Sequence, residues 1–277
     1  MVIQNLSCIA IVKERKQSLS ANIFQMNFLR VIFLLIIFLP FKIWPDQGLM
    51  IAVASNFSQT AEKLGDKFTL ETQIPIIISS ASTSNLYAQI INGAPYDIFL
   101  AADIERPKKL EENKYAVSGS RITYAVGALT LLSFDSSFKN NECIAAIKNG
   151  SYKKLAIANP EIAPYGLAAK EFLKNIGQWE SIQNQIVLGE NVSQTLLFAA
   201  TRNATFALVS RSQATMKLPI QPTCIWDIPS NMHSEIKQQA ILLSQSENSK
   251  LAQLFLNFLS GPEANSIIQD SGYSVIK

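Results

Sequence analysis

The segment Met50-Ile51-Ala52-Val53-Ala54-Ser55-Asn56-Phe57 joins a short apolar run to the start of a helix. The apolar run has the length of a buried β-strand. Apolar residues then recur with the spacing of one helix face, at Phe57, Ala61, Leu64 and Phe68. A strand that passes directly into a helix is the repeating unit of an α/β protein. The segment therefore predicts an α/β fold and places Ser55 and Asn56 at a strand-to-helix junction.

The same alternation continues along the chain. Further strands are predicted at residues 74–78, 97–101, 122–133, 155–158, 186–188 and 206–209. Helices are predicted around residues 86–90, 106–115, 165–176, 192–200 and 251–258, with a last helix opened by Pro262. This order predicts mainly parallel sheets with helices on both faces.

Composition narrows the class of protein. The chain has 277 residues, of which 48% are hydrophobic and 16% charged, so it can bury a large core and is not disordered as a whole. Residues 1–45 hold five of the 24 Lys and Arg residues and one of the 21 acidic residues. The remainder is therefore close to neutral, which argues against a basic surface for nucleic acid.

The first 45 residues are predicted to be an export leader. Arg30 precedes an apolar run from Val31 to Leu39, which is too short for a spanning helix but has the length of a signal-peptide core. Met26 is a candidate true start, with residues 1–25 as an upstream extension. No small-residue cleavage motif follows, so removal of the leader and its retention as a membrane anchor both stay open.

Export bears on the cysteines. Cys143 and Cys224 remain after the leader, and in an oxidising compartment they either form a disulfide or stay as two buried thiols. With His233 as the only histidine and no C-x-x-C motif, a zinc site of the usual kind is not expected. The same scarcity argues against a serine hydrolase that would use Ser55 or Ser210 as nucleophile.

Four strand-to-helix junctions carry hydroxyls, amides or free backbone N–H groups. They are Ser55-Asn56, Ser82-Thr83-Ser84, Ala163-Pro164-Tyr165-Gly166 and Gly189-Glu190-Asn191-Val192. The first N–H groups of a helix lack partners within the helix and carry partial positive charge. Such junctions meet at the carboxyl ends of the strands, where together they would make an anion site without Lys or Arg. The alternative is that each junction is an ordinary helix cap.

A resemblance favours the anion site. The segments 82–90 and 92–103 resemble the periplasmic molybdate-binding proteins of ABC importers. Further similarity lies at residues 54–57, 159–166, 189–192 and 261–264, so that it spans about Met50 to Tyr273. The resemblance implies a type II periplasmic binding protein, a non-enzyme in which two α/β lobes close over molybdate or tungstate. It also implies a monomer that needs no cofactor and delivers the anion to a membrane permease.

The resemblance also implies the ligand-binding residues. They are Ser55 with Asn56, Thr83, Tyr165 and Val192, the last two through backbone N–H groups, with Ser82, Ser84, Asn191 and Ser210 as weaker candidates. Thr83 stands where the family usually has serine, and Ser210 where one branch has tyrosine. Molybdenum is expected as the bound oxyanion, without a direct protein ligand.

The chemistry of this site predicts selection by size. A dianion that leaves water needs several charge-assisted hydrogen bonds, which neutral fixed donors supply without a protonation switch. Sulfate has the shape and charge of molybdate but shorter bonds, so a rigid cavity must discriminate by radius. Phosphate would need an acceptor, which Glu161 or Glu190 would supply only by pointing inward.

The lobes are predicted at residues 48–124 with 240–277, and at 125–239, with hinges near 122–126 and 238–240. The sequence does not choose between molybdate and tungstate. A receptor for another tetrahedral oxyanion such as sulfate is the alternative function.

Overall fold

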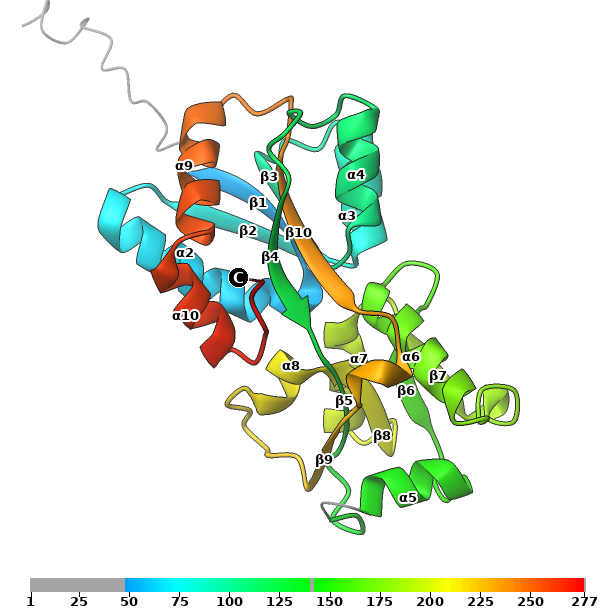
Figure 1. Ribbon diagram of the computed structural model, residues 1–277. Coiled ribbons are helices and arrows are strands. Elements are labelled where there is room, and N and C mark those ends of the chain that lie inside the picture. Colours follow the sequence, from blue (N-terminus) through cyan, green and yellow to red (C-terminus); the bar gives the residue numbers. More distant parts are fainter. Residues whose placement is uncertain (1–47, 140–141, 277) are drawn as a thin grey trace, which may run out of the picture. The chain divides into compact units, whose positions relative to one another are not determined.

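The computed structural model describes residues 48–139 and 142–276. The predicted leader, residues 1–45, lies outside this part of the chain. Two five-stranded sheets organise the described residues, and helices flank each of them (Figure 1). Over these residues no helix has both the length and the apolar character needed to cross a membrane.

The first sheet has the strand order β2-β1-β3-β10-β4. Its strands are β1 (Leu49–Ala54), β2 (Ile76–Ala81), β3 (Ile98–Ala101), β4 (Ile122–Gly127) and β10 (Ile236–Leu242). β1 pairs in parallel with β2 and β3, whereas β10 lies antiparallel between β3 and β4. β10 is therefore the one strand of this sheet that runs against the others.

The second sheet repeats this plan with the order β7-β6-β8-β5-β9. Its strands are β5 (Leu129–Ser133), β6 (Leu155–Ala158), β7 (Ile186–Gly189), β8 (Phe206–Ser210) and β9 (Cys224–Asp227). β6, β7 and β8 are parallel, and β5 runs against its neighbours β8 and β9. Two mainly parallel α/β sheets, as the sequence predicts, are confirmed.

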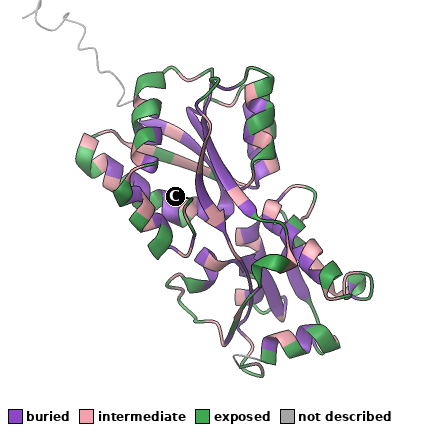
Figure 2. Ribbon diagram, viewed as in Figure 1, coloured by how far each residue is buried: buried purple, intermediate pink, exposed green. Residues whose placement is uncertain are grey.

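Helices connect most of these strands. They are α2 (Ser58–Thr72), α3 (Thr83–Ile91), α4 (Glu105–Glu112), α5 (Glu142–Asn149), α6 (Pro164–Asn175), α7 (Val192–Ala200), α8 (Arg211–Thr215), α9 (Ser249–Leu259) and α10 (Pro262–Asp270). Short 3₁₀ turns lie at Ser55–Phe57, Gln183–Gln185 and Ser230–Met232. The helices bury one side and expose the other, while the strands are largely buried (Figure 2).

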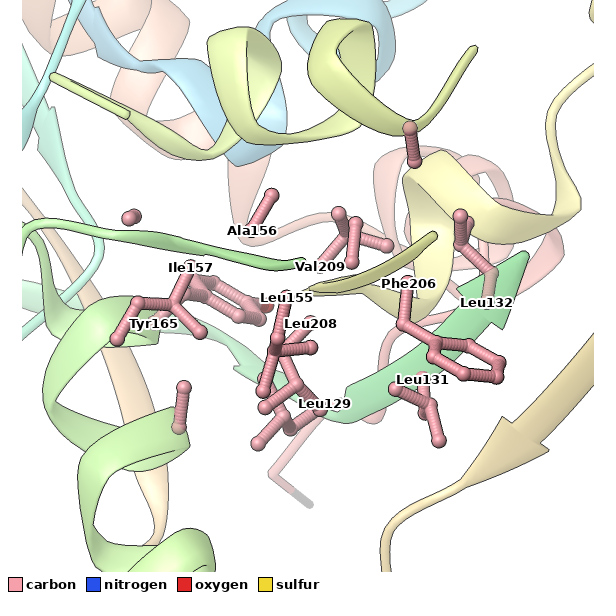
Figure 3. Packing of buried hydrophobic residues seen from close by; sticks show 14 of the residues in the cluster. Leu129, Leu131, Leu132, Leu155, Ala156, Ile157, Tyr165, Phe206, Leu208 and Val209 are labelled. Atoms are coloured by element: carbon pink, nitrogen blue, oxygen red, sulfur yellow. The ribbon is translucent and has the colours of Figure 1, made fainter. Parts of the chain in front are cut away.

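Side chains alternate along β1, so this strand contributes buried residues to both faces of the first sheet. Ile51 and Val53 pack with α2, α9 and α10, whereas Ala52 faces the cluster that contains Leu86 and Ile90 of α3. The predicted helix stripe that begins at Phe57 is buried in the former cluster. In the second sheet, side chains of β5, β6 and β8 such as Leu131, Ile157 and Leu208 pack together with Tyr165 of α6 (Figure 3).

The structure differs from the sequence prediction at residues 122–133. The predicted single strand is divided at Ala128 into β4 and β5, which belong to different sheets. The chain returns to the first sheet between Asp227 and Ile236. The lobe limits and hinges drawn from the sequence stay predictions, although both predicted hinges fall on β4 and β10.

Strand β10 was not predicted, because its centre carries Lys237, Gln238 and Gln239 rather than an apolar run. β9, α5 and α8 were not predicted either. Cys143 of α5 and Cys224 of β9 are joined by a disulfide, with their Cα atoms 6.2 Å apart. Of the two states open from the sequence, the structure therefore has the bridge.

Candidate ligand-binding site

A small cavity lies where four strand-to-helix junctions meet, two from each sheet. Its lining consists of Ala54, Ser55, Asn56, Ser82, Thr83, Ala102, Ala163, Pro164, Tyr165 and Val192. The centre of a water-sized sphere can occupy about 10 Å³ of this cavity. By the usual sizes of binding pockets, this space suits one small occupant and is too small for a sugar or a peptide.

Three helices begin at the cavity with a free backbone N–H. Thr83 opens α3, Tyr165 follows Pro164 in α6, and Val192 opens α7. Among the described residues, none accepts a hydrogen bond from these three nitrogens. Proline has no N–H, so Tyr165 supplies the first donor of α6. In α7, the Asn191 side chain accepts from Ser193 N and Gln194 N, which leaves the N–H of Val192 free.

Hydroxyl groups supply further donors. Ser82 is 3% exposed, and within the described part of the chain its Oγ has no hydrogen-bond partner. Thr83 Oγ1 accepts a hydrogen bond of 3.3 Å from Ala102 N, which leaves its own hydrogen free to be donated. Ser55 is buried and donates no side-chain hydrogen bond to the residues that the structure describes. An unpaired polar group in a buried position is costly unless a ligand completes it.

The cavity lining carries no ionisable acid or base other than the tyrosine phenol, which is bonded elsewhere. Glu161 and Glu190, the two candidate acceptors, are exposed and do not line it. The field at the cavity therefore comes from peptide dipoles at the starts of α3, α6 and α7, which favour an anion. Nor do the described residues hold a cluster of three His, Cys, Asp or Glu that suits a metal ion.

Three of the weaker candidates have other partners. Ser84 Oγ accepts from Arg106 Nη2 at 2.6 Å, and Asn191 caps α7. Ser210 caps α8, where its Oγ accepts from Gln213 N at 3.3 Å. None of the three lines the cavity. The structure thus brings together Ser55, Asn56, Ser82, Thr83, Tyr165 and Val192 from the predicted set.

A buried polar network that the sequence did not reveal lies beside the cavity. Asn56 Nδ2 donates to Gln238 Oε1 at 2.9 Å and to Tyr273 Oη at 3.2 Å, so both of its side-chain hydrogens are used. Gln238 Nε2 donates to Tyr165 Oη at 3.3 Å. Burial raises the pKa of Tyr165 and Tyr273 well above the usual value of 10 and keeps both phenols protonated.

No local sequence signal marks this network. Its partners are 73 to 217 residues apart along the chain, and Gln238 lies on a strand without apolar periodicity. His233, whose position decides the hydrolase alternative, bonds the carbonyl of Ser234 through Nδ1 and contacts neither Ser55 nor Ser210.

Comparisons with known proteins find relatives that match most of the chain. The molybdate-binding protein ModA of Azotobacter vinelandii is 36% identical over 225 residues, which are 81% of this chain and 89% of that protein. ModA of Rhodobacter capsulatus is 39% identical over 222 residues, or 80% of this chain and 86% of that protein.

Solved structures share the fold. The periplasmic molybdate-binding protein of Azotobacter vinelandii aligns with a TM-score of 0.77 at 35% identity, over 83% of this chain and 100% of that one. The sulfate-binding protein SubI of Mycobacterium tuberculosis aligns with a TM-score of 0.65 at 8% identity, which shows a common fold alone. A family model described as bacterial extracellular solute-binding protein matches residues 49–274, and with two sheets and a small cavity lined by both, the chain belongs to that family.

Proposed function

We propose that this protein is the extracytoplasmic receptor of an ABC importer and that it captures molybdate or tungstate at the cavity. The observation that carries the proposal is the set of unpaired neutral donors around one small space. These donors are the N–H groups of Thr83, Tyr165 and Val192 and the hydroxyls of Ser55, Ser82 and Thr83. The identity to two molybdate-binding proteins supports the choice of anion.

The donor set favours a fully ionised tetrahedral anion. Each N–H or O–H directed at an anion forms a charge-assisted hydrogen bond, about twice as strong as a neutral one. Phosphate near neutral pH carries a proton that needs an acceptor, and the lining has no carboxylate. Because the donors belong to helix starts and strand ends, their spacing is fixed by the fold, and anions of different radius are then distinguished by fit.

The proposal includes delivery rather than turnover. A receptor of this family hands its solute to a membrane permease, and the chain is proposed to do so as a monomer, without catalysis and without a resident cofactor. We place the protein outside the cytoplasm. It is there either free, after removal of the leader, or anchored to the membrane by a retained leader.

Calorimetric titration of the protein lacking residues 1–45 with molybdate, tungstate and sulfate tests the proposal. Molybdate and tungstate are expected to bind with one site per chain, and sulfate at least about tenfold more weakly, a difference of about 1.4 kcal/mol. Sulfate that binds as tightly as molybdate would instead establish the alternative receptor. If none of the three anions binds, the cavity is not an oxyanion site and the proposed function is wrong.

A further inference from the structure

Gln238 is the buried side chain that joins the two halves of the cavity. It belongs to β10 of the first sheet and is fully buried. Its Oε1 accepts from Asn56 Nδ2 at 2.9 Å and from Tyr124 Oη at 3.1 Å, and its Nε2 donates to Tyr165 Oη at 3.3 Å. One amide group therefore holds three side chains from three elements.

Two of these partners are close to donors of the cavity: Asn56 is adjacent to Ser55 in the chain, and Tyr165 carries a donor on its own backbone. Asn56 follows Ser55 in the 3₁₀ turn after β1, on the first sheet. Tyr165 contributes its backbone N–H at the start of α6, on the second sheet. The path Asn56–Gln238–Tyr165 thus fixes the separation of donors that lie on opposite sides of the cavity.

The surroundings make this path rigid. A Cβ atom on Gly127 would collide with Tyr165 Oη and come within 2.8 Å of Gln238 Nε2, so the absence of a side chain there gives the two groups room to meet. Asn56 is also held by Tyr273, whose Oη donates to Asn56 O at 2.7 Å. Every group in the path is buried, and a buried polar group that loses its hydrogen-bond partner is destabilising. The path therefore resists changes in length.

We infer that Gln238 is a positioning residue that sets the radius of the oxyanion cavity and thereby its preference for molybdate over the smaller sulfate. The inference rests on the proposed function. If the path is broken, the donors of the two sheets approach or separate more freely. A cavity of variable radius can then contract around sulfate and no longer favours the larger anion.

The test replaces Gln238 by methionine, which has similar length and volume but neither donates nor accepts in the same way. Kd values for molybdate and sulfate are measured by calorimetry for the wild-type protein and for Gln238→Met. We expect the molybdate Kd to rise about tenfold or more, and the ratio of sulfate Kd to molybdate Kd to fall at least about fivefold.

The neighbouring Gln239 provides a matched control. It is 9% exposed and also uses both ends of its amide, since Nε2 donates to Thr123 Oγ1 at 3.0 Å and Oε1 accepts from Arg121 Nη1 at 3.1 Å. None of these partners lines the cavity. Gln239→Met should therefore lower thermal stability to a similar extent and leave the ratio of the two Kd values unchanged.

A second variant covers the case in which Gln238→Met does not fold. Tyr165→Phe removes the hydroxyl that Gln238 holds and keeps the backbone N–H at the cavity, and it should lower the Kd ratio in the same direction. A wild-type ratio in Gln238→Met, or in Tyr165→Phe where Gln238→Met does not fold, overturns the inference while the wild-type protein still binds molybdate. Absence of molybdate binding by the wild-type protein is a different outcome, which overturns the proposed function itself.

Discussion

Ser193 Oγ, near the start of α7, donates a hydrogen bond of 3.2 Å to the backbone carbonyl of Ser55, in the 3₁₀ turn after β1. At the edge of the cavity, this hydrogen bond connects α7, which follows β7 of the second sheet, to the turn that follows β1 of the first sheet. Gln213 Nε2 donates to the same Oγ at 2.9 Å and so orients it. This hydroxyl therefore stabilises the arrangement in which the Ser55 and Val192 donors face one space.

Ser193→Ala is expected to weaken molybdate binding by about 0.5–1.5 kcal/mol, because the hydrogen bond between the two sides is lost while every cavity donor remains. Thr201→Ala, at the other end of the same helix, removes a hydroxyl that bonds only within its own segment and should leave affinity unchanged. Titration of both variants measures the difference. Equal affinities would show that the Ser193 contact does not contribute to ligand binding.

Ser82→Ala should separate stability from binding. The Ser82 hydroxyl has no partner among the described residues, so its removal from the ligand-free protein loses no hydrogen bond and should leave the melting temperature unchanged or slightly higher. Molybdate affinity should fall by roughly 1–3 kcal/mol, since the anion would complete that hydroxyl.

Ser120→Ala is the control for Ser82→Ala, with the opposite expected effects on stability and on affinity. Ser120 is also buried, but its Oγ donates to Val117 O at 2.7 Å and accepts from Leu242 N at 3.2 Å, away from the cavity. This variant should lose about 1 kcal/mol of stability and keep its affinity. If Ser82→Ala behaves in the same way, Ser82 is a structural residue and does not bind the anion.

Sequence reasoning predicted the parts of the site that depend on neighbouring residues. A helix start after a buried strand is a local pattern, so the sequence alone indicates the junctions. The resemblance to molybdate-binding proteins then selects Thr83, Tyr165 and Val192 within them, and the structure places all three at one cavity. Ser82 is one of the weaker candidates that the resemblance implies. In the structure its side chain does not cap α3, and Ser82 lines the cavity.

The remainder of the site depends on contacts between distant residues, for which a single sequence has no signal. Gln238 meets Asn56 across 182 residues, and Asn56 meets Tyr273 across 217. The division of residues 122–133 was missed for the same reason, since both halves are apolar and only the pairing of β4 with β10 and of β5 with β8 separates them.

Gly127→Ala should disturb the site through Tyr165. The added methyl group would overlap the Tyr165 hydroxyl in a packed core, and overpacking of this kind costs about 1–3 kcal/mol. Urea unfolding and molybdate titration should both show the loss. In the double variant with Tyr165→Phe, the overlap with the hydroxyl is relieved although the close approach to Gln238 Nε2 remains, so the two stability changes should be less than additive. Strict additivity would show that Gly127 and Tyr165 do not constrain each other.

The disulfide should stabilise the protein without affecting the ligand. Cys143 and Cys224 are 81 residues apart, and closure of a loop of that length corresponds to roughly 4 kcal/mol in the chain-entropy model. Neither residue lines the cavity. The double variant Cys143→Ala, Cys224→Ala should therefore unfold at a lower urea concentration and bind molybdate with wild-type affinity. Counting of free thiols in the denatured wild-type protein should give none from this pair.

Alkaline pH should destabilise the protein through its buried tyrosines. Burial raises the pKa of Tyr124, Tyr165 and Tyr273 above the usual value of 10, so the folded protein keeps these phenols protonated where the unfolded chain ionises them. Their contribution to stability is therefore complete below about pH 10 and falls as the pH rises further, by up to about 1.4 kcal/mol per pH unit for each group.

Tyr124→Phe removes one such group, so the free energy of unfolding of this variant should fall less steeply above pH 10 than that of the wild-type protein. Urea unfolding at a series of pH values from 8 to 11 measures the two slopes, and identical slopes would show that Tyr124 ionises in the folded protein as readily as in the unfolded chain.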